Sequence, residues 1–172
     1  MMRVRVGKIK DIPGEIMRVK TEVSLSVMED GKKEVVFTQA LRLELELTGT
    51  GSAILVEGTV KTAVQLSCDR CLKPFSLPVE APFSETYYPA GLGQKIHREE
   101  WVPFKDEVID LMPEVMKTIL IELPMKAVCQ DDCRGICPSC GQNLNTGDCN
   151  CEHEKIDSRL GVLKDLVKQK ET

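Results

Sequence analysis

Hydrophobic and polar residues alternate along the chain from Val19 to Phe83, which is the pattern of half-buried β-strands. In Leu41–Leu47, leucine occupies every second position and charged residues occupy the others. A second alternating stretch follows the turn Thr48–Ser52, with apolar positions at Ile54, Val56, Val60, Val64 and Leu66. We therefore expect an antiparallel β-sheet that is curled toward a barrel or sandwich.

The next expected strand carries two prolines. Its inward positions are Phe75, Leu77, Val79, Ala81 and Phe83. Pro78 and Pro82 fall on the opposite face. Because proline cannot donate a hydrogen bond to a neighbouring strand, we expect this strand to lie at an edge or to be bent there.

A helical spacing of four residues follows from Leu111 to Ile119 and predicts one packed helix over about residues 110–123. Asp110 is the expected cap, Pro113 is tolerated in the first turn, and Pro124 ends the helix. The residues expected to stay on its polar face are Glu114, Lys117, Thr118 and Glu122.

The segment from Pro89 to Lys105 has no clear period and reads as an exposed connection. It contains His97 and Trp101, and a lone tryptophan here is more typical of a packing clamp than of a base-stacking residue. A last helix is expected over about Ser158–Lys168, capped by Asp157. Its buried positions would be Leu160, Leu163, Leu166 and Val167.

Together these patterns predict an α+β fold with two domains. Residues 1–124 form a β-rich core domain with the helix at about 110–123. Residues 125–172 are expected to form a cysteine-rich module with the C-terminal helix. A chain of 172 residues with 42% hydrophobic content is long enough for one core and a small appended module.

Charge limits the contacts that this chain can make with nucleic acid. The formal net charge is −4; eight ionised thiols would add eight negative charges and two zinc ions four positive ones, which gives −8. An aromatic content of 4% also argues against a broad stacking platform for single strands. Any RNA contact must then be local, and the first twenty residues carry a net charge of +4. The RNA-contact candidates are Arg3, Arg5, Lys8 and Lys10, and the alternative is a solvated edge strand.

The chain has eight cysteines in two blocks, one in mid-chain and one near the C-terminus. It has no apolar N-terminal run typical of a secretory signal and no apolar run long enough to span a bilayer, so we expect a cytoplasmic protein. In that reducing compartment clustered cysteines favour metal over disulfides. Thiolate preferences favour zinc, with two ions per chain, over iron in a rubredoxin-like site.

Cysteine spacing favours two sites of four thiolates. The pair Cys137 and Cys140 forms a tight turn that Gly141 can close. Cys149 and Cys151 project from one face of an extended segment, and Asn143–Gly147 has the turn residues to fold them back. These four form what we term the C-terminal cluster: Cys137, Cys140, Cys149 and Cys151.

The remaining four cysteines form what we term the split cluster: Cys68, Cys71, Cys129 and Cys133. An ion at this cluster would join the mid-chain loop to the C-terminal module. An alternative pairing joins Cys68 and Cys71 with Cys137 and Cys140, as in zinc ribbons.

Several segments, taken together, resemble the YceD family of large ribosomal RNA subunit accumulation proteins. They are Ser67–Pro74, Ile109–Leu111, Leu123–Pro124, Cys133–Asn145 and Asp157–Leu160. The resemblance implies a bacterial cytoplasmic factor that supports the production or stability of large-subunit ribosomal RNA. It would act with that RNA or with a pre-ribosomal particle. The resemblance supplies no catalytic residues. The chain departs from the family motif at Ser158, where a helix-opening proline is common.

Three classes of function fit these features. A noncatalytic ribosome-biogenesis factor with structural zinc is favoured, because closed four-thiolate coordination leaves no position for a substrate water. A redox-responsive protein would release metal when Cys68 and Cys71 are oxidised. A metal-dependent hydrolase or nuclease is least favoured, since His97 and His153 are the only histidines. Nothing in the sequence indicates a membrane partner or a small-molecule substrate.

Overall fold

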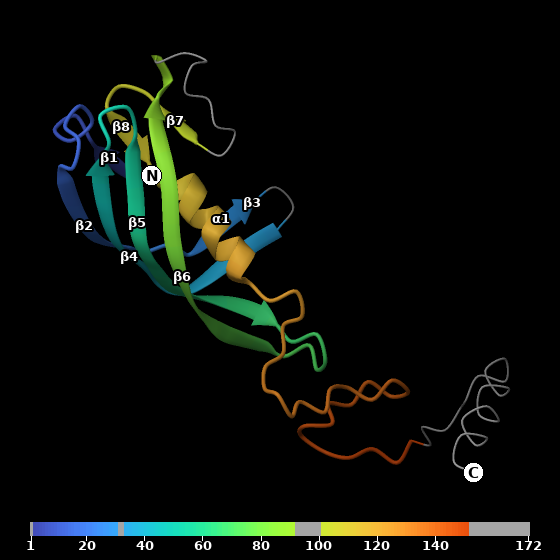
Figure 1. The fold of residues 1–172 in the computed structure, drawn as a ribbon. Helices are drawn as coiled ribbons and strands as arrows, with labels where there is room; N and C mark the ends of the chain where they lie inside the picture. Colours follow the sequence, from blue (N-terminus) through green and yellow to red (C-terminus); the bar gives the residue numbers. More distant parts are fainter. Residues whose placement is uncertain (1, 31–32, 92–100, 152–172) are drawn as a thin grey trace, which may run out of the picture. The chain divides into compact units, whose positions relative to one another are not determined.

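The computed structural model describes residues 2–30, 33–91 and 101–151, and its elements are labelled in Figure 1. Within these residues the chain is mostly strand, with one α-helix. The elements are β1 (Arg3–Arg5), β2 (Ile16–Val23), β3 (Val27–Asp30), β4 (Lys33–Gly49), β5 (Ile54–Ser67), β6 (Pro74–Pro89), β7 (Val102–Phe104), β8 (Val108–Asp110) and α1 (Met112–Glu122).

The chain divides into two compact units. The β-sheet unit comprises Met1–Ser67 and Pro74–Ala127. The cysteine unit takes the loop Cys68–Lys73 together with the segment that begins at Val128. The sequence expected a boundary after residue 124, with the mid-chain loop in the core domain, and that division stays a prediction.

The main sheet has the strand order β2-β4-β5-β6-β7, with β3 also paired to β4. Its long strands are antiparallel, whereas β6 and β7 are parallel, so the sheet is mixed. The path from β2 to β7 is open, and the predicted curling into a barrel or sandwich is not confirmed. The parallel strand β7 lies in the segment that was expected to be only a connection.

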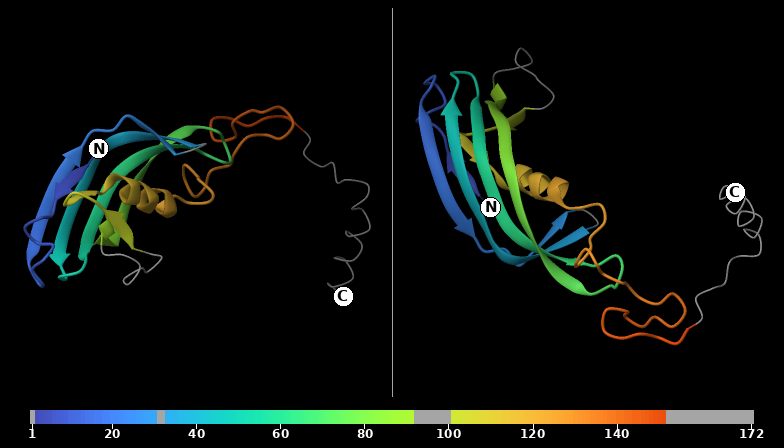
Figure 2. Two further views of the ribbon diagram at one scale, coloured as in Figure 1. Left: turned by 90° about the horizontal axis from the view of Figure 1, so that it is seen from above. Right: turned by 60° about the horizontal axis from the view of Figure 1, so that its bottom comes forward.

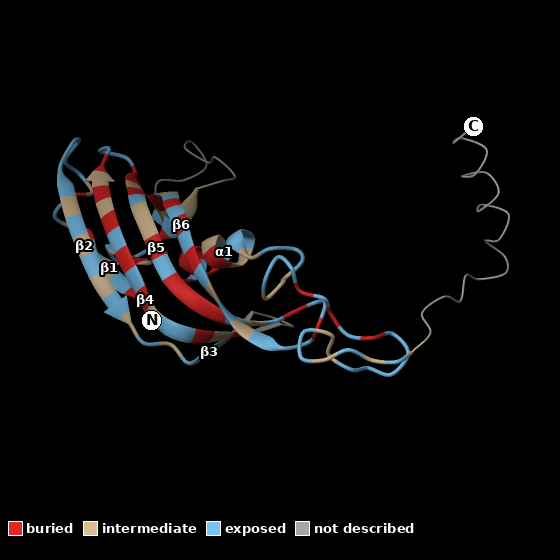
Figure 3. Ribbon diagram, turned by 90° about the horizontal axis from the view of Figure 1, so that it is seen from below, coloured by how far each residue is buried: buried red, intermediate tan, exposed pale blue. Residues whose placement is uncertain are grey.

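Alternation along β4 places leucines in the core, as predicted. The side chains of Leu41, Leu43, Leu45 and Leu47 are buried. The charged positions between them face away from the core, and Figure 3 shows the resulting alternation of buried and exposed bands. These charges form cross-strand ion pairs with β2, which are Arg18–Glu46, Lys20–Glu44 and Glu22–Arg42. Burial of the leucines provides the main stabilisation, because exposed ion pairs contribute little.

Strand β6 is an edge strand over most of its length, as its prolines predicted. It pairs with β5 from Pro74 to Tyr87, and among the described residues its other side is paired only at Tyr87–Pro89. Pro78 and Pro82 are exposed, whereas Val79 and Phe83 are buried.

Helix α1 packs against β6, and Figure 2 shows the two elements side by side. Pro113 lies in its first turn, and the backbone N–H of Met112 donates to Oδ1 of Asp110 over 3.1 Å. The expected polar position of Glu114 is wrong. Its side chain is buried, and its carboxylate pairs with Lys117 at 2.8 Å.

Strands β1 and β8 form a separate two-stranded sheet, with Arg3 opposite Asp110 and Arg5 opposite Val108. The turn between Lys105 and Val108 places two consecutive non-glycine residues at positive φ, 52° at Asp106 and 56° at Glu107. The turn is held by a hydrogen bond from the Val6 N–H to the Glu107 carbonyl.

Other sequence expectations fall outside the described residues. These are His97, His153 and the last helix at about Ser158–Lys168 with its cap Asp157. Trp101 is described and is partly buried. The helix that the structure does describe is too short to cross a bilayer.

Candidate metal centres

The four sulfurs of the split cluster lie within 4.8 Å of one another. The Sγ–Sγ separation is 3.8 Å between Cys68 and Cys133 and 3.7 Å between Cys71 and Cys129. A tetrahedron with metal–sulfur bonds of about 2.3 Å has edges of about 3.8 Å, so these separations fit a four-thiolate ion. They are far too long for disulfide bonds, and all eight cysteines are free.

The Cys68–Lys73 loop presents two of these sulfurs from a tight turn between β5 and β6. The Leu72 N–H donates to the Cys68 carbonyl, and the Cys68 N–H donates to the Lys73 carbonyl. Leu72 closes the turn at a φ of 61° and exposes 64% of its side chain. Cys68 and Cys71 are buried, at 0% and 5% exposure. The turn therefore exposes an apolar side chain to solvent and buries two thiols.

Arg70, between the first two cysteines, ties this loop to the C-terminal segment. Its guanidinium Nη1 donates to the carbonyls of Asp131 and Cys133, over 3.1 and 3.0 Å. Its own carbonyl accepts the N–H of Ile136. Gly135 lies at a φ of 79°, and a Cβ there would make a tight contact of 3.0 Å with the Arg70 carbonyl oxygen. Neither residue was predicted from the sequence.

The four sulfurs of the C-terminal cluster also lie within 4.8 Å of one another. The turn at Cys137 and Cys140 is closed by a hydrogen bond from the Gly141 N–H to the Cys137 carbonyl, with Gly141 at a φ of 75°. The backbone N–H groups of Ser139 and Cys140 both approach the Cys137 sulfur at 3.4 Å. Cys137 is buried and Cys140 is exposed.

The loop after this turn carries Asn145, whose side chain contacts both halves of the cysteine unit. Its Oδ1 accepts the N–H of Arg134 at 2.8 Å, and its Nδ2 approaches the Cys133 sulfur at 3.4 Å. Its own N–H donates to Oδ1 of Asn143, which is the side-chain turn that the composition of this loop predicted. Asn145 thus links the C-terminal loop to a sulfur of the split cluster.

Each cluster contains one thiol that ionises easily. At Cys68 burial opposes the thiolate, but backbone hydrogen bonds from Cys129, Cys71 and Arg70 outweigh it and lower the pKa to about 6. At Cys137 the Cys140 backbone hydrogen bond has the largest effect, and the pKa is again lowered to about 6.

Other thiols in both clusters keep their protons more firmly. Burial, followed by hydrogen bonding to Cys68, raises the pKa of Cys129 to about 12. Hydrogen bonding to Cys140, followed by burial, raises the pKa of Cys151 to about 12. Without a cation, four adjacent sulfurs cannot all ionise at neutral pH, so a metal ion would displace the protons that they share.

The structure therefore brings together the eight predicted ligands in the groups that the spacing favoured. Cys68 and Cys71 lie with Cys129 and Cys133, and the zinc-ribbon pairing with Cys137 and Cys140 is not formed. Four sulfur donors fit zinc or iron, and each group can hold a metal ion.

Comparison with known families identifies the chain over most of its length. The model of the family described as "Large ribosomal RNA subunit accumulation protein YceD" matches residues 56–167, which include all eight cysteines. The chain belongs to the YceD family.

Three relatives show how widely this similarity extends. An uncharacterized protein of Mycobacterium tuberculosis (strain H37Rv) is 30% identical, with 96% of this chain and 81% of the relative covered. The "Large ribosomal RNA subunit accumulation protein YCED homolog 1, chloroplastic" of Arabidopsis thaliana is 28% identical over 99% of this chain and 56% of its own length. The uncharacterized protein YlbN of Bacillus subtilis is 21% identical, with 98% of each chain covered. No solved structure matches significantly.

The basic N-terminal residues of this YceD-family chain lie in different settings. Arg3 and Arg5 are exposed on β1, and Lys8 is exposed in the segment that follows. Lys10 forms ion pairs with Glu107 and Asp11, so its charge is partly neutralised. The Glu107 contact raises the pKa of Lys10 and keeps it protonated.

Proposed function

We propose that this protein is a noncatalytic zinc-binding factor in ribosome biogenesis that supports the synthesis, processing or stability of large-subunit ribosomal RNA. The observation that carries the proposal is membership of a family described by the accumulation of that RNA, together with the same wording in the name of the Arabidopsis relative. Its partner is large-subunit ribosomal RNA or a pre-ribosomal particle, and its location is the cytoplasm.

The cysteine geometry supports a structural role for the metal. Each cluster supplies four sulfurs at separations that suit a closed tetrahedral ion. A hydrolytic metal site keeps one coordination position open for water, whereas four cysteine sulfurs would occupy all four positions in each of these clusters. Incubation of large-subunit RNA with the loaded protein should therefore leave the RNA intact.

Burial argues against the redox alternative. Oxidation of Cys68 and Cys71 would have to reach two sulfurs in residues that are 0% and 5% exposed. Reactive cysteines are accessible thiolates, so mild peroxide should act first at the C-terminal cluster, where Cys140 is exposed. Early oxidation of Cys68 and Cys71 with release of metal would favour the alternative.

Direct contact with RNA would use the basic N-terminal surface. Arg3, Arg5 and Lys8 are exposed, which supports these residues as contacts, and Lys10 adds less because Glu107 pairs with it. Reversing the four charges should remove most of any affinity for a large-subunit RNA fragment and flatten its dependence on salt. If RNA binding stays unchanged in this variant, these charges belong to a solvated edge strand and do not contact RNA.

The proposal is tested most directly in cells. Deletion of the gene in its host should lower the ratio of large-subunit to small-subunit ribosomal RNA, and the parent gene should restore it. A variant with Cys133→Ser and Cys140→Ser should fail to restore the ratio, whereas Ser139→Ala is the matched control in the same turn. An unchanged ratio after deletion would overturn the proposed function.

A further inference from the structure

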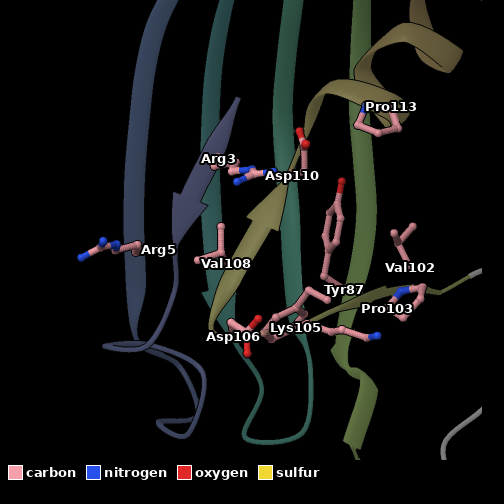
Figure 4. A pocket seen from close by; sticks show the side chains of 11 residues that line it. Arg3, Arg5, Tyr87, Val102, Pro103, Lys105, Asp106, Val108, Asp110 and Pro113 are labelled. Atoms are coloured by element: carbon pink, nitrogen blue, oxygen red, sulfur yellow. The ribbon is translucent and has the colours of Figure 1, made fainter. Parts of the chain in front are cut away.

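A pocket of about 660 Å³ lies in the β-sheet unit, between strands β1, β7 and β8 and the first turn of α1. Its apolar wall includes Val102, Pro103, Phe104 and Pro113. Its polar side includes three cations and two carboxylates. Figure 4 shows Arg3 and Asp110 on one side of the Tyr87 ring and Lys105 below it, while the guanidinium of Arg5 points away from the ring. The size is within the range of small-molecule sites, roughly 300–1,000 Å³.

The hydroxyl group of Tyr87 is the most informative atom in this pocket. The residue is only 1% exposed, and among the described residues its hydroxyl has no hydrogen-bond partner. Figure 4 shows the hydroxyl directed toward Asp110 and Pro113. Burial, followed by the charges of Glu114, Glu85 and Asp110, raises the pKa of Tyr87, so the group stays a protonated donor. Buried polar groups are rarely left without a partner, and a ligand acceptor would supply one.

Three cations line the pocket and form no ion pair within the described part of the chain, although the guanidinium of Arg5 points away from the pocket. They are Arg3 and Arg5 on β1 and Lys105 beside the Asp106–Glu107 turn, and all three are exposed. On the sheet, described cations such as Arg18 and Lys61 pair with Glu46 and Glu80. The pocket therefore differs from these positions in having cations with no ion pair among the described residues.

The pocket also has a strained and firmly held rim. Asp106 and Glu107 are consecutive residues in the left-handed region, at φ 52° and 56°. The Val6 hydrogen bond and the Lys10 ion pair both hold Glu107. Strain of this kind persists where surrounding structure enforces it, and it is frequent at ligand sites. The turn fixes Lys105 and Asp106 at the edge of the pocket.

This combination selects a ligand with an anionic part and a flat apolar part. A bare phosphate would make no use of the apolar wall, and a purely apolar molecule would leave the cations and the tyrosine donor unused. We propose that the pocket binds one nucleotide, with its phosphate at Arg3 and its base against Pro103 and Phe104. The acceptor atoms of the base lie toward the Tyr87 hydroxyl. If the nucleotide belongs to RNA, this site rests on the proposed function and identifies one of its RNA contacts. The same groups would also recognise a free mononucleotide.

The test uses the full-length, metal-loaded protein. Calorimetric titrations with the four nucleoside monophosphates and with short single-stranded RNA distinguish the two sources. Binding of mononucleotides identifies a free-nucleotide site, whereas binding of RNA alone identifies a contact within a strand. Failure of both to bind overturns the proposal.

Tyr87→Phe is the decisive variant, because it removes only the hydroxyl. Removing a donor that has no protein partner should leave thermal stability unchanged or raised, while affinity should fall about three- to tenfold. Arg3→Gln should weaken binding and reduce the salt slope by roughly 0.7 for a single strand. Lys61→Gln, which removes a paired cation on the sheet, is the matched control and should have no effect on binding.

Ligand affinity that is the same in Tyr87→Phe, Arg3→Gln and the parent would overturn the site. The ribosomal RNA ratio in deleted cells is measured independently. If that ratio falls while the pocket binds no nucleotide, the proposed function stands and only the nucleotide site fails.

Discussion

The two units of this protein are held together by different means. In the β-sheet unit, the buried side chains are mostly leucine, valine and isoleucine from long strands and one helix. In the described part of the cysteine unit, the buried residues are Gly135 and four cysteines, namely Cys68, Cys71, Cys133 and Cys137. No aliphatic or aromatic side chain is buried there, and no helix or strand is formed.

This contrast indicates what each unit requires in order to fold. Apolar burial is enough for a sheet with a continuous core, whereas some thirty residues without such a core generally need a crosslink or a metal. Hydrogen bonds donated by the Arg70 guanidinium and accepted by Asn145 Oδ1 orient the loops of the cysteine unit, but they are partly solvated and cannot replace a core. The fold of this unit should therefore depend on metal.

Removal of metal should produce the largest difference between the units. A strong chelator under reducing conditions should unfold the described cysteine unit, because structural zinc contributes about 10–16 kcal/mol in zinc-finger peptides. The β-sheet unit should keep its amide spectrum. Residue-resolved NMR before and after chelation measures both effects, and restored zinc is the control. A cysteine unit that keeps its dispersed amide signals without metal would contradict the comparison.

Loss of one ligand should affect one metal only. Cys68→Ser should reduce the metal content from two ions to one, because it opens the split cluster and leaves the other four sulfurs in place. Cys140→Ser should remove the other ion, and the double variant should bind none. Elemental analysis of the three variants measures this. Loss of both ions from Cys68→Ser alone would mean that the two clusters depend on each other.

A substitution in the apolar core should destabilise the β-sheet unit and leave both metal sites intact. Leu45→Ala should lower the free energy of unfolding of the β-sheet unit by about 2–5 kcal/mol, since it leaves a cavity beside β2 and β5. The two metals should stay bound. Denaturant unfolding and metal analysis measure these outcomes. Leu72→Ala is the control, because that leucine is 64% exposed, and a comparable loss of stability there would be unexpected.

Sequence periodicity predicted the parts of the fold that depend on neighbouring residues. The buried leucines of β4 follow from strict alternation, and the turn at Cys137 follows from spacing and Gly141. Interactions between distant residues were missed. Three interactions join residues that are far apart in the sequence, so no local sequence pattern predicts them. They are the parallel pairing of β7 with β6, the Arg70 hydrogen bonds and the Lys10–Glu107 ion pair. Glu114 was placed on the polar face because spacing alone does not reveal a buried ion pair.

Substitution of two glycines in the cysteine unit should have the smallest effect on metal affinity. Gly135→Ala and Gly141→Ala both place alanine at positive φ, which costs roughly 1–2 kcal/mol. Only position 135 adds a close contact, at 3.0 Å from the Arg70 carbonyl oxygen. Chelator competition should therefore show a greater loss of metal affinity for Gly135→Ala. Equal losses would mean that this contact relaxes freely.

The central claim is that two four-sulfur metal sites organise the cysteine unit. The most direct test is elemental analysis with X-ray absorption on the full chain, purified under reducing conditions without chelator. We predict two zinc ions per chain, each with four sulfur neighbours at about 2.3 Å. One ion or none, or a metal with oxygen or nitrogen neighbours, would contradict it.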